Sequence, residues 1–244
     1  MSSRTTAIVG WTAAVLAIVA FVSLGQWQLS RMHQKQAMLD AVEATLAART
    51  ALPLSVAGDA ARARDYDWSA GQGRFVDRPA FVLDNQIRAG VPGLRVYRLF
   101  APVDAAPLLV DLGWTPLADR ATRLPEAAVV RGDGLLGRDV ALRGLLAPPP
   151  SAGLALGPAL APGDAVLMTR IELDAIAANA GLPALPPRVL RVDPALDVGY
   201  ARDLDVLPNT LPPDKHLGYA VQWFGLALAV LVIALVLTFR KRRR

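Results

Sequence analysis

The chain has 244 residues, 53% of them hydrophobic, and its formal net charge of +5 is unevenly distributed. Residues 31–215 carry 20 basic and 21 acidic side chains, so the excess of cations lies at the two ends, which argues against nucleic acid as a partner of the central region. The chain has no cysteine, which excludes disulfides, thiolate metal sites and thiol catalysis.

The first predicted element is a membrane-spanning helix over residues 5–30. This run contains no charged residue and lies between Arg4 and Arg31. A cleaved signal peptide is the alternative, but no small-residue cleavage site follows the hydrophobic part, so we expect an uncleaved anchor. Hydrophobic residues then recur every three or four positions from Leu29 to Leu46, which predicts that the helix continues as an amphipathic segment.

Residues 31–215 are expected to form one outer domain, because about 185 residues supply a single core. Strand-forming runs occur at 81–87, 94–100, 107–114, 139–147, 165–171 and 188–193. Since helices do not alternate regularly with these runs, we expect a mainly antiparallel β (α+β) domain, a small barrel or sandwich, rather than a doubly wound sheet. The Pro-, Gly- and Ala-rich segment 146–165 is interpreted as a loop within this domain.

One short helix is predicted inside the outer domain. Thr169 and Glu172 have the spacing of a capping box, and an apolar helical face follows them. Gly181 then supplies a C-terminal stop.

Catalysis by the outer domain is not expected. No histidine lies between His33 and His216, so a hydroxyl nucleophile would have no imidazole base. The segment DWSAG at 67–71 begins with Asp67 rather than glycine, unlike a nucleophile turn. The carboxylates are too scattered for a metal cluster, and no Gly-rich loop ends in Lys-Ser/Thr to hold phosphate. We therefore predict that the protein is not an enzyme.

A second membrane-spanning helix is predicted over residues 217–239, a run of 23 residues without a charge. As a helix this run is about 35 Å long, enough to cross the hydrocarbon core. Five cations follow it at 240–244, and positive residues favour the cytoplasmic side. Both termini are therefore expected in the cytoplasm, with residues 31–215 on the outer side.

Polar and aromatic residues gather at the predicted outer ends of both spans. Two sets of residues share helix faces there: His216, Tyr219, Ala220 and Trp223 on the second span, and Trp27, Arg31 and Lys35 after the first. One interpretation is an interfacial belt of aromatic rings with snorkelling cations. The other is a haem site in which His216 ligates the iron and Arg31 or Lys35 meets a propionate. The residues by themselves leave both interpretations open.

A series of motifs runs through the chain in a characteristic order. They are Gly25, Trp27, Gln28, Arg31 and Lys35; GRF at 73–75; LDNQIRAGVPGLRVYRLFAP at 83–102; LLVDLGWTP at 108–116; and KHLGYAVQWF at 215–224. In this order, with an apolar helix at each end, the chain resembles the Surfeit locus protein one (Shy-type) family. Two positions depart from the family pattern: Asp111-Leu112 stand where Asn-Arg is common, and Gln86 stands where an Arg is common.

The resemblance implies an assembly factor for cytochrome c oxidase in the bacterial inner membrane, with a periplasmic domain, that binds haem a or helps deliver it to subunit I. It implies subunit I, haem a synthase and membrane lipid as partners, and His216 as the ligand of the haem iron. Tyr219, Trp223, Trp27 and Arg31 would complete the cofactor site. The alternative function is a membrane-tethered scaffold that stabilises an oxidase subunit without binding cofactor.

Three residues within the matching motifs are expected to be structural. Trp114 is interpreted as a core aromatic residue at a strand end. Arg88 and Arg95, at the predicted hairpin, are interpreted as surface charges rather than a partner site.

Overall fold

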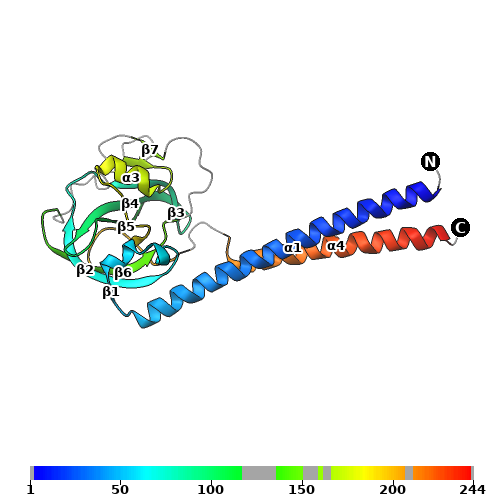
Figure 1. Cartoon of the computed structure of the whole chain (residues 1–244), viewed down its shortest axis with the longest axis horizontal. Coiled ribbons are helices and arrows are strands. Elements are labelled where there is room, and N and C mark those ends of the chain that lie inside the picture. Colours follow the sequence, from blue (N-terminus) through cyan, green and yellow to red (C-terminus); the bar gives the residue numbers. More distant parts are fainter. Residues whose placement is uncertain (1–2, 117–135, 151–158, 162–165, 207–210, 243–244) are drawn as a thin grey trace. The chain divides into compact units, whose positions relative to one another are not determined.

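A computed structural model describes residues 3–116, 136–150, 159–161, 166–206 and 211–242 (Figure 1). The chain divides into two compact units, Met1–Asp40 with Thr210–Arg244, and Ala41–Asn209. The elements in chain order are α1 (Ser3–Ala48), β1 (Leu52–Pro53), the 3-10 helices η1 (Leu54–Gly58) and η2 (Ala60–Arg62), β2 (Asp67–Phe75), β3 (Phe81–Arg88), β4 (Val91–Pro102), β5 (Leu108–Pro116), β6 (Val140–Ala147), β7 (Leu160–Ala161), β8 (Val166–Met168), α3 (Leu173–Ala180), β9 (Val189–Val192) and α4 (Pro213–Arg242).

Within the described ranges, two helices, α1 and α4, are long and apolar enough to cross a membrane. Their hydrophobic side chains are mostly exposed, whereas the core helix of a water-soluble domain would bury them. The helix α4 starts where local chemistry favours it, because Pro213 needs no N–H partner in the first turn and Asp214 complements the helix dipole. The prediction that the first helix continues beyond its apolar part is confirmed, since α1 ends at Ala48.

The unit Ala41–Asn209 is built on one mixed sheet. In the part of the chain that the structure describes, the strand order is β1-β2-β6-β9-β5-β4-β3-β8-β7, and a further pairing joins β2 to β4. This pairing of Gly73–Phe75 with Phe100–Pro102 closes β2, β6, β9, β5 and β4 into a small barrel (Figure 1). Most pairs are antiparallel, while β1–β2, β3–β8 and β5–β9 are parallel. The predicted fold class, two apolar terminal helices flanking an α+β domain, is confirmed; its proposed limits at 31 and 215 stay a prediction.

Side chains on the barrel strands alternate between the barrel interior and the outer face of the sheet, as the two-residue period of a strand requires, and the two largest hydrophobic clusters lie on these two faces. One cluster receives residues from all five barrel strands and fills the interior; it includes Phe75, Phe100, Val110, Leu142, Leu146 and Leu190. A second cluster lies on the other face of the sheet, under α3, and includes Phe81, Tyr97, Leu99, Leu109, Met168 and Ile176.

The helix α3 begins differently from the prediction. Its N-cap is Glu172, which makes no side-chain capping hydrogen bond, so the capping box from Thr169 is wrong. The Glu172 carboxylate accepts from Arg170 Nε instead, which takes it away from the helix amides. The predicted stop is confirmed: Gly181 is left-handed, with φ 69°, and its N–H donates to carbonyls of the last turn.

The segment DWSAG proves to be the start of strand β2. Asp67 is buried, and its carboxylate accepts hydrogen bonds from both Arg62 and Arg188. Arg188 is wholly buried and also donates to the carbonyl of Val56. The carboxylate therefore compensates a buried cation, which is a structural role.

The predicted loop 146–165 falls largely outside the described residues. Its described residues 159–161 include the short strand β7, which pairs with β8. The basic run 240–244 is described only to residue 242.

Candidate functional site

The candidate cofactor site lies in the unit formed by α1 and α4, which contact one another. A small residue permits their closest approach: a Cβ on Gly25 would lie 2.7 Å from the ring of Phe224. Two further contacts along the pair are a stack of Phe21 on Trp223, with centroids 5.7 Å apart, and a hydrogen bond of 3.0 Å from Trp11 Nε1 to Thr238 Oγ1. The two predicted spans therefore pack together, which the sequence left open.

His216 is held between these helices by an amide. Its Nδ1 lies 2.6 Å from Oε1 of Gln28, and since this oxygen can only accept, Nδ1 carries the proton. In the neutral ring the other nitrogen, Nε2, bears a lone pair; it is buried and has no hydrogen-bond partner among the described residues. A neutral imidazole whose Nδ1–H is fixed by a second residue has the arrangement that metal-ligating histidines use. Because Nε2 is covered, iron could reach it only after neighbouring side chains moved.

The residues predicted to share helix faces do not all lie in the contact between α1 and α4. His216 is buried and Trp223 is half-buried against α1, while Tyr219 is 44% exposed and Trp27 is 55% exposed. Arg31 is exposed and donates to Gln34 Oε1 at 3.1 Å. Trp27 and Tyr219 thus remain free to serve in an aromatic belt, since neither is buried by the helix contact.

Two neighbouring residues on α1 differ in their surroundings. Lys35 is half-buried and donates from Nζ to the carbonyl of Leu211, beside the start of α4. His33 is exposed. Of these two residues, Lys35 is the one that contacts the segment leading into α4.

The sequence interpretation assigned no role to several residues that form the helix contact. On α1 they are Phe21, Gly25 and Gln28, and on α4 it is Phe224. A signal existed for part of this set, because Gly25 and Gln28 are one helical turn apart and both occur in the matching motifs.

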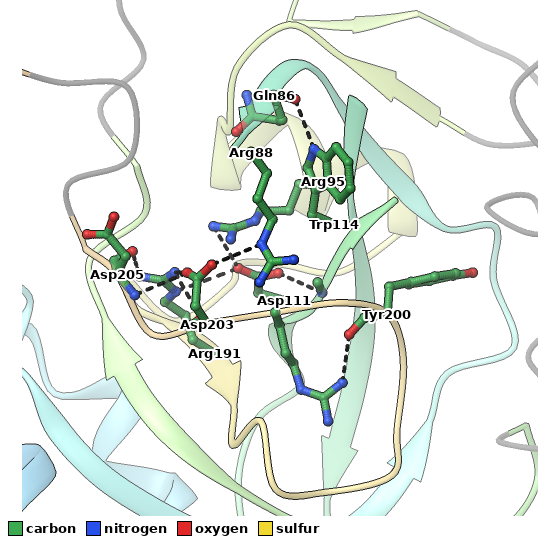
Figure 2. A network of polar contacts seen from close by, with 11 residues as sticks. Gln86, Arg88, Arg95, Asp111, Trp114, Arg191, Tyr200, Asp203 and Asp205 are labelled. Atoms are coloured by element: carbon green, nitrogen blue, oxygen red, sulfur yellow. Dashed lines mark hydrogen bonds and ion pairs between the residues drawn. The ribbon is translucent and has the colours of Figure 1, made fainter. Parts of the chain in front are cut away.

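A second polar cluster lies in the unit Ala41–Asn209, on the outer face of the barrel strands (Figure 2). Arg95 is buried at 6% exposure, and its Nη1 lies 3.4 Å from Oδ2 of Asp111, so its assignment as a surface charge was wrong. Arg191 from β9 lies 3.7 Å from the same carboxylate oxygen. Asp111, which stands on β5 where the family commonly has Asn, thus supplies the buried anion of this cluster. Burial lowers the pKa of the Arg191 guanidinium below its ordinary value, against the pull of Asp111.

The other two hairpin residues have defined partners. Arg88 is partly exposed, and its Nε donates to Asp203 Oδ2 at 3.1 Å. Trp114 is half-buried, and its indole Nε1 donates to the carbonyl of Gln86 at 2.9 Å (Figure 2). The tryptophan therefore joins β5 to the β3–β4 hairpin.

In the described part of the chain, no group of three or more His, Cys, Asp or Glu side chains could hold a metal ion. A comparison with family models matches residues 15–228 to the SURF1 family. The chain belongs to the SURF1 family. The match covers most of the protein, including part of each terminal helix and both polar clusters. A search of curated proteins finds no match.

SURF1-family membership carries a general function. The family is linked to the assembly of cytochrome c oxidase, and its members are assembly factors rather than enzymes. Family membership and the two apolar helices together indicate a membrane-associated protein of oxidase assembly.

Proposed function

We propose that this protein assists the maturation of cytochrome c oxidase by binding haem a transiently and helping to deliver it to subunit I. The observation that carries the proposal is the Nε2 atom of His216, which is buried and has no hydrogen-bond partner in the described part of the chain, while Nδ1 is held by Gln28. An unpaired buried nitrogen is costly, and its retention is explained if it serves as a ligand in another state of the protein.

The residues around His216 fit a haem group in their chemistry. Haem iron accepts a neutral imidazole nitrogen as an axial ligand, and His216 offers one. Gln28 fixes the orientation of the ring, and the stacked rings of Phe21 and Trp223 provide an apolar flank on the same helix pair. Lys35 supplies a cation near the outer end of α4, suited to a propionate.

We further propose that the helices span the bacterial inner membrane with both termini in the cytoplasm. The support is the run of cations after the second apolar segment, which favours the cytoplasmic side. The domain between the spans is then periplasmic, where it would meet subunit I or haem a synthase. No catalytic step is assigned to it.

Two observations favour a second function, a tethered scaffold that binds no cofactor. Nε2 of His216 is covered in this structure, and Trp27 and Tyr219 are exposed as membrane anchors would be. On this alternative the bond between His216 and Gln28 serves only to join the two helices.

The two functions are separated by purifying the full chain from cells that make haem a and recording its visible spectrum. We expect a haem spectrum for the wild type, its loss in His216→Ala, and about 10- to 100-fold weaker haem retention in Gln28→Ala, as for other residues that orient a ligand. His33→Ala is the matched control, since His33 is exposed on the same helix pair, and it should keep the spectrum. A colourless wild type that still co-purifies with an oxidase subunit would favour the scaffold.

A further inference from the structure

Residues 199–205, which we call the strap, lie along the edge of β5 at residues 112–114, beyond the end of its pairing with β9. The strand β9 pairs with β5 only at Val110 and Asp111. Beyond that point the strap takes over: Tyr200 N–H donates to the Leu112 carbonyl at 2.8 Å, and Trp114 N–H donates to the Ala201 carbonyl at 2.7 Å. The strap therefore binds to residues 112–114 as an added antiparallel strand would.

Glycines allow the close approach of the two backbones. Gly113 has φ 112°, and a Cβ there would lie 2.8 Å from the carbonyl oxygen of Ala201. A Cβ on Gly199 would overlap the carbonyl of Leu112. The edge is thus shaped to receive main chain rather than side chains.

The carboxylate of the strap lies among arginines of the sheet (Figure 2). Asp203 accepts from Arg88 at 3.1 Å and lies 3.8 Å from Nη2 of Arg191. Arg191 also donates from Nη1 to the carbonyl of Asp205 at 2.5 Å. The strap is therefore held by main-chain pairing and by one carboxylate, the two means by which a peptide ligand is recognised.

Arg191, which contacts the strap, is not fully satisfied. Its Nε is buried, lies 3.7 Å from Asp111 Oδ2 and has no hydrogen-bond partner among the described residues. In the same part of the chain, the ion pairs of this cluster join three guanidinium groups, those of Arg88, Arg95 and Arg191, to two carboxylates. A ligand with further acceptor oxygens would satisfy these donors better than the strap does.

We propose that residues 112–114 of β5, with Arg88 and Arg191, form a binding site for an extended acidic peptide segment, and that the strap occupies it as a displaceable internal ligand. The middle of the strap is suited to displacement, because Ala201 is exposed and Asp203 is partly exposed. Leu204, next along the chain, packs in a hydrophobic cluster and keeps the strap attached at that end. A partner with a carboxylate in the place of Asp203 would add to β5 as the strap does now.

Amide hydrogen exchange of the full chain in detergent tests the first half of the proposal. In Asp203→Asn we expect the amides of Trp114 and Tyr200, which bridge strap and strand, to exchange about tenfold faster, since exchange follows local opening. Asp139→Asn is the matched control, because Asp139 is exposed and pairs with Arg74 elsewhere on the barrel, and it should leave these two amides unchanged. If the Trp114 and Tyr200 amides exchange at the wild-type rate in Asp203→Asn, the proposal is overturned. Wild-type exchange of the sheet amides of β2 and β6 in the same variant would verify that it is folded.

A synthetic peptide tests the second half. The probe has the sequence of residues 197–206, DVGYARDLDV, and is added to the Asp203→Asn protein at about 1 mM, in the range of an intramolecular effective concentration. We expect it to restore protection of the Trp114 amide, and the same peptide with Asn in place of its central Asp to restore much less. Equal protection by both peptides, or none by either, would show that the arginines do not form a carboxylate site.

Discussion

The substitution Gly25→Val should separate the two terminal helices locally and change the hydrogen bonding of His216. A Cβ at position 25 would lie 2.7 Å from two carbons of the Phe224 ring. Non-bonded carbons rest about 3.5–4.0 Å apart, so the helices must separate by about 1 Å or the ring must move by as much.

This displacement is large compared with the tolerance of a hydrogen bond. Gln28 lies one helical turn from Gly25 on the same face, and its Oε1 is 2.6 Å from His216 Nδ1. Opening by about 1 Å lengthens that contact to about 3.6 Å, which is no longer a hydrogen bond. The Nδ1–H form of the ring then loses its stabilisation.

The ¹⁵N NMR spectrum of histidine-labelled full chain in detergent reports this change directly. The chain has two histidines, and the exposed His33 serves as an internal reference. We expect His216 to be the neutral Nδ1–H tautomer in the wild type. In Gly25→Val, we expect it to shift toward the Nε2–H tautomer.

Gly10→Val is the matched control for the loss of a helical glycine. A Cβ at Gly10 meets no atom of the described residues within 4 Å, so this variant changes helix propensity without touching α4. It should leave the His216 signals as in the wild type. If Gly25→Val also leaves them unchanged, the contact at Phe224 does not position the histidine and the reasoning fails.

Three further predictions concern the stability of the barrel unit, measured by urea unfolding of the full chain in detergent. Asp67→Asn removes the carboxylate that compensates the wholly buried Arg188, and should lower the free energy of unfolding by about 3–5 kcal/mol; adding Arg188→Met should restore part of it. Burial raises the pKa of Asp67, but hydrogen bonds from Arg62 and Arg188 together lower it by more than burial raises it. The pKa of Asp67 in the folded protein therefore lies below its ordinary value. Its stabilisation is therefore complete above about pH 4 and is lost as the pH falls through the depressed pKa, and this acid-dependent loss should be absent in Asp67→Asn. Gly144→Ala would place a Cβ against the Arg191 carbonyl between β6 and β9 and should cost about 3 kcal/mol; a wild-type unfolding curve would contradict the tight pairing of these strands.

The sequence predicted most strands of the domain, because their apolar residues form short runs bounded by turns, but it missed β2, whose residues 69–74 are small or polar. The runs at 81–87 and 94–100 correspond to β3 and β4, and the run at 107–114 to β5. The two-residue strands β1 and β7 gave no such signal, since their pairing depends on neighbours far away in the chain.

The candidate site was predicted only in part. His216 was identified because it is one of two histidines and lies beside an apolar run, but its partner Gln28 was not assigned a role. Helical spacing placed Tyr219 with His216 and placed Trp27 with Arg31, yet it could not say which side of each helix meets the other. That choice depends on Gly25, whose missing side chain admits Phe224.

The burial of charged side chains in the barrel unit was not predicted from the sequence. Arg95 lies in a motif that looks like an exposed hairpin, and an arginine is usually exposed. Its burial follows from the position of Asp111 on the neighbouring strand and of Arg191 on the strand beyond it. Neither neighbour is close to Arg95 in the sequence.

The sequence by itself determined that the chain has two apolar helices with a strand-rich, cysteine-free domain between them, because hydrophobicity and strand propensity act residue by residue along the chain. Only the tertiary structure decided that Nδ1 of His216 meets Gln28 and that the carboxylate of Asp203 meets Arg88. These contacts join residues far apart in the sequence, and such contacts depend on how the helices and strands pack rather than on any local pattern.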